Sequence, residues 1–452
     1  MDDERVVETA IALACELCAL PSVSAHGEGL EETAGCVERL LGESGFRTRV
    51  LRAGGSAPAV WGELAGRSPY TLLLYNHYDV QPEDPVDEWV TPAFSPDIRD
   101  GRVYARGAAD NKGQIATRLA VIRAIRDEQG TLPFSLRWII EGEEESGSTN
   151  FAAIAREHAD LLRADAALWE GSSPDAGGRP EISIGFKGVL AFRLDVRTMR
   201  TDAHSGSVGV LPNAGWRLLE ALDVIRGDSR GSPGWSGFHA DVVPPDRAAR
   251  EALDQHGDAW EREIAEAYGV ERFVDGVSGR AFRERLCLEP SLNIAGIHTG
   301  YSGPGMKTVT PSEASAWLDF RLVPNERPDE LLTALRRRLD EGGCGDVELT
   351  VLAAAPPSGI AIDHPLVRRV ASIATDVAGA HPLIFPMFPG SLPLLTAMDE
   401  YVGVPGLSAP DNPIYNGCCF HAPNEHIRVA DIALAIRHTR RLLEDLHQPP
   451  GE

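Results

Sequence analysis

Five short polar segments of the chain combine residue types that bind divalent metal ions. They contain His77 with Asp79, Asp110, Glu144 with Glu145, Glu170, and His421, and most of them follow an apolar stretch. Imidazole and carboxylate ligands together favour zinc, manganese or cobalt over calcium. Carboxylates gathered this densely would repel one another without cations. The two histidines and three of these carboxylates therefore suit a pair of metal ions.

The chemistry that such a pair supports is hydrolysis of an amide. Two ions acidify a shared water and polarise the scissile carbonyl. One carboxylate outside the ligand set has to take the proton of that water and hand it to the leaving amine. Glu144 stands beside Glu145 in the acidic run 141–147 and is available for this role.

The predicted secondary structure would place these residues at the ends of strands. Apolar periodicity predicts helices over 4–19, 29–44, 114–126 and 429–446, and strands over 47–51, 59–64, 70–75 and 134–140. His77 and Asp79 would then point to one face at a strand end, where α/β proteins gather their sites. We predict an α/β domain with a central mixed sheet flanked by helices.

A second pattern begins near residue 188. Strands over 189–197 and 314–322, with helices over 214–226 and 329–341, predict a small α+β domain. Residues 227–290 are rich in Gly, Pro, Asp and Trp and are predicted to form an insertion with short helices. We assign residues 1–187 and 359–452 to the α/β catalytic domain and residues 188–358 to the α+β domain.

Length and composition limit the classes of function. The chain has 452 residues, 43% of them hydrophobic, which is enough for two domains. A net charge of -24 excludes the basic surface that nucleic acids or anionic membranes require. We expect neither a secretory signal nor a membrane span. The seven cysteines show no framework of spacings, so we expect a cytoplasmic enzyme.

At these residues the sequence resembles the M20 metallopeptidases, which include carnosine dipeptidases, acetylornithine deacetylase, succinyl-diaminopimelate desuccinylase, aminoacylases and carboxypeptidases. The resemblance covers almost the whole chain. It implies two zinc ions, with manganese or cobalt as alternatives. It further implies the following roles: Asp110 bridges both ions, His77 and Glu170 bind one, Glu145 and His421 bind the other, Glu144 is the general base, and Asp79 orients His77. The peptide bond between Asp110 and Asn111 is then expected to be cis.

The resemblance also assigns a role to the α+β domain. It implies that this domain acts as a lid and forms a homodimer, with His204 reaching the partner's active site to stabilise an oxyanion. Asn213 follows at the family's spacing, Arg321 would contact a substrate carboxylate, and Gly390 with Ser391 forms a substrate-binding loop. A guanidinium pairs bidentately with a carboxylate, which suits that role.

Three departures from the dipeptidase branch bear on the substrate. Residues 386–389 read Pro-Met-Phe-Pro where relatives place charged residues, residues 353–357 lack an expected histidine, and His426 replaces a basic or polar residue. Apolar surface thus stands where a charged contact would read a dipeptide carboxylate. We expect the substrate to be an N-acyl amino acid, an amide, or a dipeptide with an apolar side chain.

Simpler interpretations of each motif are available. A His-x-Asp pair is usually a hydrogen-bonded pair, an acidic run is usually a solvated loop, His204 could cap a turn, and Arg321 could form a surface ion pair. Cys15 and Cys18 are expected to lie in the core, and Cys418 and Cys419 to pack and not to bind metal.

Five ligand-type segments in the family's order favour a metallohydrolase of dipeptidase type. The alternatives are an N-acyl amino acid deacylase using the same site and a catalytically silent dimeric binding protein.

Overall fold

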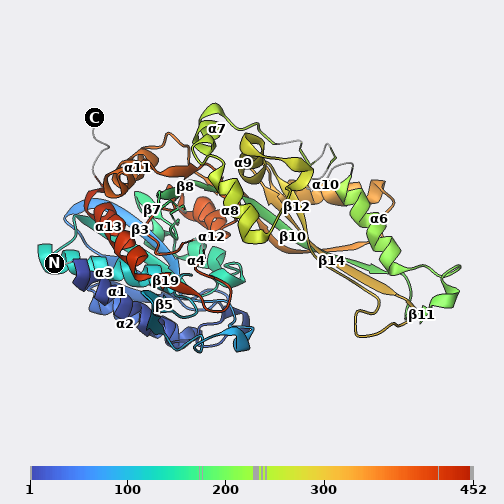
Figure 1. Ribbon diagram of the computed structural model, residues 1–452, viewed down its shortest axis with the longest axis horizontal. Helices are drawn as coiled ribbons and strands as arrows, with labels where there is room; N and C mark the ends of the chain where they lie inside the picture. The colour runs from blue at the N-terminus through green and yellow to red at the C-terminus, as the bar shows by residue number, and fades with distance from the viewer. Residues whose placement is uncertain are drawn as a thin grey trace. The chain divides into compact units, whose positions relative to one another are not determined.

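The chain divides into two compact units (Figure 1). The first unit comprises Met1–Gly185, Gly359–Pro386 and Leu394–Glu452, and the second comprises Phe186–Ser358 and Met387–Pro393. The computed structural model describes residues 3–172, 174–175, 177–227, 234–235, 238–239, 242–415 and 417–447. Each unit has a hydrophobic core of its own.

A six-stranded mixed sheet forms the centre of the first unit. Its order is β1 (Arg47–Leu51), β2 (Ala59–Leu64), β6 (Phe134–Glu141), β3 (Ser68–His77), β7 (Ala166–Leu168) and β18 (Gly406–Leu407). The first two strands pair antiparallel, whereas β6, β3, β7 and β18 are mutually parallel. The carboxyl ends of these four strands therefore meet at one edge of the sheet.

Helices cover both faces of this sheet, which explains the continuous apolar run of β3. Leu72 and Leu74 belong to the core that includes α1 (Asp3–Cys18), α2 (Leu30–Glu43), α3 (Lys112–Gln129), α11 (Pro365–Ala378) and α13 (Val429–Asp445). Tyr75 points to the other face, where its ring lies 6.2 Å from that of Phe151 in α4 (Phe151–Glu157). The short helices α5 (Ala159–Leu162) and α12 (Leu394–Ala397) lie beside α4.

Two small sheets support the loops at the edge of the central sheet. One is antiparallel and consists of β19 (His426–Arg428), β5 (Arg102–Tyr104) and β4 (Asp97–Arg99). The other pairs β17 (Leu383–Phe385) with β8 (Glu181–Ser183). The amide of Ala105 donates to the carbonyl of Glu425 at 3.1 Å, so the first of these sheets joins segments from the two ends of the chain.

The second unit is built on a four-stranded antiparallel sheet in the order β12 (Ser291–Thr299), β14 (Glu313–Leu322), β10 (Gly188–Arg197) and β15 (Glu348–Ala355). Helices α6 (Ala214–Arg226) and α10 (Pro328–Glu341) pack on one face of it. Buried residues alternate with more exposed ones along β10 and β14, as a sheet covered on one face requires. Phe192 and Phe320 contact each other in this core with ring centroids 5.4 Å apart.

Shorter elements complete the second unit. Strands β11 (Ala203–His204) and β13 (Val309–Thr310) form a two-stranded sheet. The stretch predicted as an insertion contains the short helices α7 (Arg247–Asp254), α8 (Ala259–Tyr268) and α9 (Gly279–Leu288). Part of residues 227–241 lies outside the described residues.

The expected class, a mixed α/β sheet flanked by helices, is confirmed. Most predicted elements end within two residues of the observed ones, and α6 matches its prediction at both ends. Strands β7, β12 and β15 and helix α11 were not predicted. Cys18 and Cys418 are buried as expected, but Cys15 is only partly buried and Cys419, which has a φ of 57°, is exposed. Within the described residues, no helix has both the length and the hydropathy to cross a membrane.

His438 in α13 provides a test of this core. Burial, followed by the charge of Arg437, lowers the pKa of His438 from 6.5 to about 4. Between these values the unfolded chain binds a proton that the folded chain does not, so the free energy of unfolding decreases as pH falls from 6.5 to 4. We predict that His438→Leu removes up to about 3 kcal/mol of this decrease. Urea unfolding at several pH values measures it.

The matched control is His26→Leu, because His26 is exposed. Its pH dependence of unfolding should follow that of the parent protein. A His438→Leu curve parallel to that of the parent would contradict the prediction.

Candidate metal centre

The edge where the parallel strands end carries several of the predicted ligands. His77 is the last residue of β3 and lies opposite Glu141, the last residue of β6. A 3-10 turn over Glu144–Ser146 follows β6, and Glu170 lies two residues beyond the end of β7. The parallel register therefore gathers groups from three strands at one place, as open α/β sheets do.

Two loops supply the remaining candidate ligands. Asp110 directly precedes the segment that opens α3, and its peptide bond to Asn111 is cis, as the resemblance implied. His421 lies in the loop between β18 and β19 and has a φ of 60°. All five predicted ligands thus come from the first unit.

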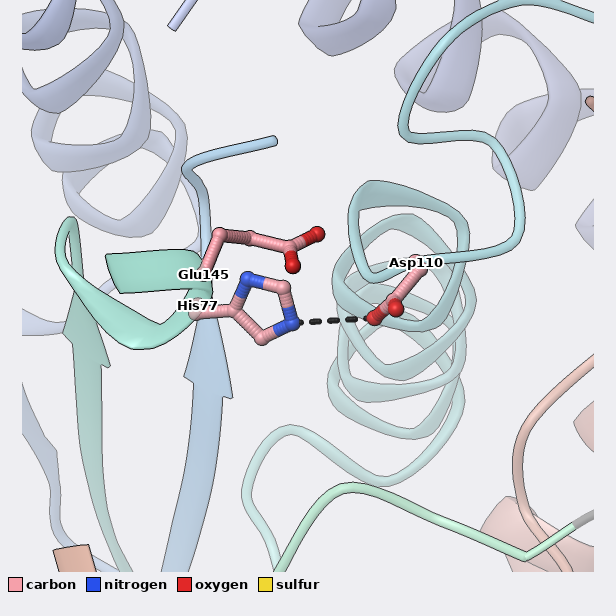
Figure 2. A group of neighbouring side chains, drawn as sticks. All are labelled: His77, Asp110 and Glu145. Atoms are coloured by element: carbon pink, nitrogen blue, oxygen red, sulfur yellow. Dashed lines mark hydrogen bonds and ion pairs between the residues drawn. The ribbon is translucent and has the colours of Figure 1, made fainter. Parts of the chain in front are cut away.

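The Asp110 carboxylate lies between the two histidines. Its Oδ1 is 3.0 Å from Nε2 of His77, and its Oδ2 is 3.0 Å from Nε2 of His421. Each imidazole has a second carboxylate neighbour: Glu170 Oε2 at 3.4 Å from His77, and Glu145 Oε2 at 3.2 Å from His421. Figure 2 shows His77, Asp110 and Glu145 converging from different elements. One ligand atom from each of the three lies within 4.8 Å of the others.

If both histidines were neutral, hydrogen bonds alone could not satisfy the nitrogen and oxygen atoms in this arrangement. Nδ1 of His77 lies 3.1 Å from the carbonyl oxygen of Asp79, so its proton belongs on Nδ1. The lone pair on Nε2 then faces carboxylate oxygens of Asp110 and Glu170. The buried Oε2 of Glu170 also has no hydrogen-bond partner among the described residues. Only an added proton or a metal ion reconciles these groups, and the nitrogen and oxygen donors fit a divalent ion.

The pKa values of the two histidines also support a metal site. Burial lowers the pKa of His421, but hydrogen bonds with Asp110 and Glu145 outweigh this effect and raise it to about 10. The pKa of His77 is likewise raised well above its usual range, because the Asp110, Asp79 and Glu170 carboxylates outweigh burial. In the absence of metal, protons therefore occupy the nitrogen atoms that a divalent ion would bind.

Asp79 holds both His77 and the turn with the predicted base. Its Oδ1 lies 3.4 Å from Nδ1 of His77 and accepts from the amide of Glu144 at 3.2 Å. Its Oδ2 accepts from the amide of Glu145 at 3.0 Å. Asp79 is fully buried, so this arrangement is shielded from water. The expected orienting role of Asp79 thus rests on two sets of contacts.

Glu144 occupies a position suited to proton transfer. Burial raises its pKa well above the usual range, and the charge of Glu170 raises it further. A carboxyl group with a raised pKa can hold a proton between two steps of a reaction. Neighbouring Glu145 is held instead by Gln81, whose Nε2 donates to Oε2 of Glu145 at 2.8 Å.

Glu425 was not assigned a role from the sequence, although it lies in the His421 segment. Its Oε1 accepts from the amides of Ala109 at 2.8 Å and Asp110 at 3.1 Å. Its Oε2 accepts from the amide of Gly107 at 2.9 Å and from the Arg106 guanidinium at 2.8 Å. Glu425 therefore fixes the loop that presents Asp110. A carboxylate left over after the ligands were assigned was the only available signal.

A buried network behind Glu170 was also missed. The Arg118 guanidinium donates to Asp411 at 2.8 Å and to the carbonyl of Trp169, directly before Glu170, at 2.8 Å. Gln114 accepts from the amide of Gly171 at 3.2 Å and donates to Asp411 at 2.9 Å. The backbone on both sides of Glu170 is thus held by α3. No sequence spacing reveals partners separated by almost 300 residues.

The remaining predicted site residues lie in the second unit. Exposed His204 accepts a hydrogen bond from the amide of Gly206 at 3.0 Å, and Asn213 caps α6 by accepting from Gly215 at 2.8 Å. Arg321 pairs with Asp319 at 3.2 Å and donates to Ser391, which follows Gly390, at 3.0 Å. The simpler roles considered for His204 and Arg321, capping a turn and forming an ion pair, are therefore observed. The substrate and oxyanion roles of these residues stay predictions.

Comparison with known proteins gives the family. The model of peptidase family M20/M25/M40 matches residues 73–445. The chain belongs to this family. The crystal structure of an M20 family metallo-carboxypeptidase, Sso-CP2 from Sulfolobus solfataricus, is similar with a TM-score of 0.90 and 32% identity over 96% of this chain and 98% of that one. The structure of the di-peptidase Dug1p from Saccharomyces cerevisiae shares the fold, with a TM-score of 0.83 and 20% identity over 98% of both chains.

Two curated dipeptidases have similar sequences. The Beta-Ala-His dipeptidase of Rattus norvegicus is 29% identical over 63% of this chain, and the match spans only 58% of that relative. The Cysteinylglycine-S-conjugate dipeptidase of Corynebacterium striatum is 26% identical over 84% of this chain and 82% of its own length.

The role of Glu425 can be tested through metal retention. In Glu425→Gln an amide nitrogen would face donors that now point at a carboxylate, which loosens the Asp110 loop. We predict metal affinity lower by about 10- to 100-fold. Competition with a chelator, followed by elemental analysis, measures it. The exposed Glu32→Gln serves as control, and equal retention in both variants would contradict the role.

Proposed function

We propose that the protein is a metal-dependent hydrolase that cuts the peptide or amide bond of a small substrate. The arrangement of Asp110 between two imidazoles, each with a second carboxylate, carries the proposal. Similarity to proteins named dipeptidase and metallo-carboxypeptidase supports it. We place the enzyme in the cytoplasm, because its seven cysteines are free thiols.

We further propose that the site holds two divalent ions, zinc in the first place, with manganese or cobalt as alternatives. His77 and Glu170 would bind one ion and Glu145 and His421 the other, with Asp110 shared between them. When bound, the ions polarise the scissile carbonyl and make water acidic enough to attack it. The donor set supports zinc because imidazole and carboxylate ligands suit it.

Glu144 is the proton carrier in this proposal. It takes the proton of the attacking water and delivers it to the leaving nitrogen, so that the amine leaves uncharged. Its raised pKa lets it hold this proton while the carbon-nitrogen bond breaks. Asp79 fixes the turn that carries Glu144, so the carboxylate meets the substrate in one orientation.

The second unit contributes substrate binding and dimer formation. Arg321 binds the substrate carboxylate beside Ser391, Asn213 and Gly390 line the substrate path, and His204 stabilises the oxyanion in the partner's site. β12 is an edge strand with exposed Ile294 and Ile297, and it lines an apolar groove of about 450 Å³ with α6. An exposed apolar sheet edge of this kind is a surface on which a second copy of the chain can pair.

Glu144→Gln tests the proposed chemistry. The amide cannot accept a proton, so we predict that kcat falls by about 10²- to 10⁴-fold while the bound metal stays. Turnover of a panel of dipeptides and N-acyl amino acids, with elemental analysis, measures both. The exposed Glu157→Gln should behave like the parent. Metal-free protein that stays inert after metal is added would instead support a silent binding protein.

Ile297→Arg tests the dimer. A charge in the apolar groove opposes pairing along β12, so we predict a monomer by light scattering at concentrations where the parent is a dimer. If His204 acts on the partner's site, the monomer also loses kcat while keeping its metal. Leu352→Arg, on the strand at the opposite edge of the sheet, is the control, since Leu352 is similarly exposed. A dimeric Ile297→Arg would exclude this surface.

A further inference from the structure

The loop Met387–Pro393 belongs to the second unit, although the chain on both sides of it belongs to the first. The amide of Lys187, directly before β10, donates to the carbonyls of Phe388 at 3.2 Å and Gly390 at 3.0 Å. Phe186 and Phe388 also form a parallel bridge. The backbone of this loop is therefore fixed on the start of β10.

The side chain of Phe388 is partly exposed although its neighbour Phe186 is buried. The ring of Phe388 lies 6.0 Å from that of Phe186, which is only 8% exposed, whereas Phe388 is 40% exposed. It also lies against Gly390, where an added Cβ would stand 3.0 Å from a ring carbon. Glycine at position 390 thus leaves room for the ring. The result is a fixed aromatic surface that faces solvent.

The same loop carries a residue that contacts Arg321, the proposed partner of the substrate carboxylate. Ser391 follows Gly390, and its Oγ accepts from Nη1 of Arg321 at 3.0 Å. Nε of Arg321 donates to Asp319 at 3.2 Å, and Asp319 accepts from Asn293 at 3.0 Å. Nη2 of Arg321 has no hydrogen-bond partner among the described residues. The guanidinium is oriented, and one of its nitrogens is free to bind an anion.

We propose that Phe388 selects the side chain of the residue whose carboxylate Arg321 binds, so that the enzyme prefers substrates ending in a large apolar residue. A carboxylate and a side chain share one α-carbon in an amino acid, and the loop that carries Phe388 also carries Ser391, to which Arg321 is hydrogen-bonded. The proposal rests on the proposed function and deepens it by naming the substrate class. Leucine or phenylalanine at the carboxyl end would cover the exposed ring, and aspartate would have to be desolvated there.

Binding to the metal-loaded Glu144→Gln variant tests the selection without depending on turnover. Isothermal titration calorimetry compares Gly-Leu, Leu-Gly and Gly-Asp, together with N-acetylleucine and N-acetylaspartate. We expect Gly-Leu to bind about 10- to 100-fold more tightly than Gly-Asp and Leu-Gly. The isomer Leu-Gly carries the same side chain at the other end and so locates the preference.

Substitutions of Phe388 in the same background identify the residue responsible. Phe388→Ala should reduce the preference for Gly-Leu over Gly-Asp to less than about threefold, and Phe388→Lys should reverse it by offering a cation to aspartate. Leu352→Ala, also exposed and apolar in the second unit, should leave it unchanged.

The outcomes separate this proposal from the proposed function. Equal binding of all compounds, no binding of any, or a preference that survives both Phe388 substitutions would overturn the role of Phe388. Hydrolysis by the parent protein without an apolar preference would refute the selection and leave the hydrolase. An apolar preference in binding without hydrolysis would refute the hydrolase and leave the selection.

Discussion

Three carboxylates and two imidazoles share a small, largely buried space at the ends of β3, β6 and β7, and their mutual electrostatics constrain the structure around them. Negative charges this close repel unless cations or protons lie between them. Other buried residues therefore have to hold each group in place against that repulsion. Asp79, Glu425 and Arg118 do so through buried hydrogen bonds to backbone and side chains.

These supports also decide which groups are free to react. Asp79 binds the amides of the turn and not its side chains, so the Glu144 carboxylate is left available. Glu145, one residue further, is held by Gln81. Two adjacent glutamates thus differ in their partners, and this difference supports the roles of base and ligand proposed for them. Because Asp79 positions the turn through backbone amides, the side chain of Glu144 remains available to bind and release a proton.

The fold class was accessible from local periodicity, and the candidate ligands were accessible from short polar motifs and their resemblance to the M20 family. The apolar run 70–75 and the polar residues directly after it identify a strand and its functional end. The supporting residues depend on distant contacts: Asp411 meets Arg118 across 293 positions, and Glu425 meets Asp110 across 315. Short or exposed strands such as β7 and β12 carry weak periodicity, so they were missed. The surroundings of Phe388 required the fold, since Phe186 lies some 200 residues earlier.

The chain leaves the first unit after Gly185 and returns at Gly359, and this has a consequence for synthesis on the ribosome. All four strands of the second unit's sheet emerge before β18, β19 and α13 of the first unit exist. The middle of the chain can therefore fold while the amino-terminal strands still lack their last partners. Helix α3, which packs against α13, lacks this cover until residues 429–445 have been made, which makes shorter chains candidates for aggregation and chaperone binding.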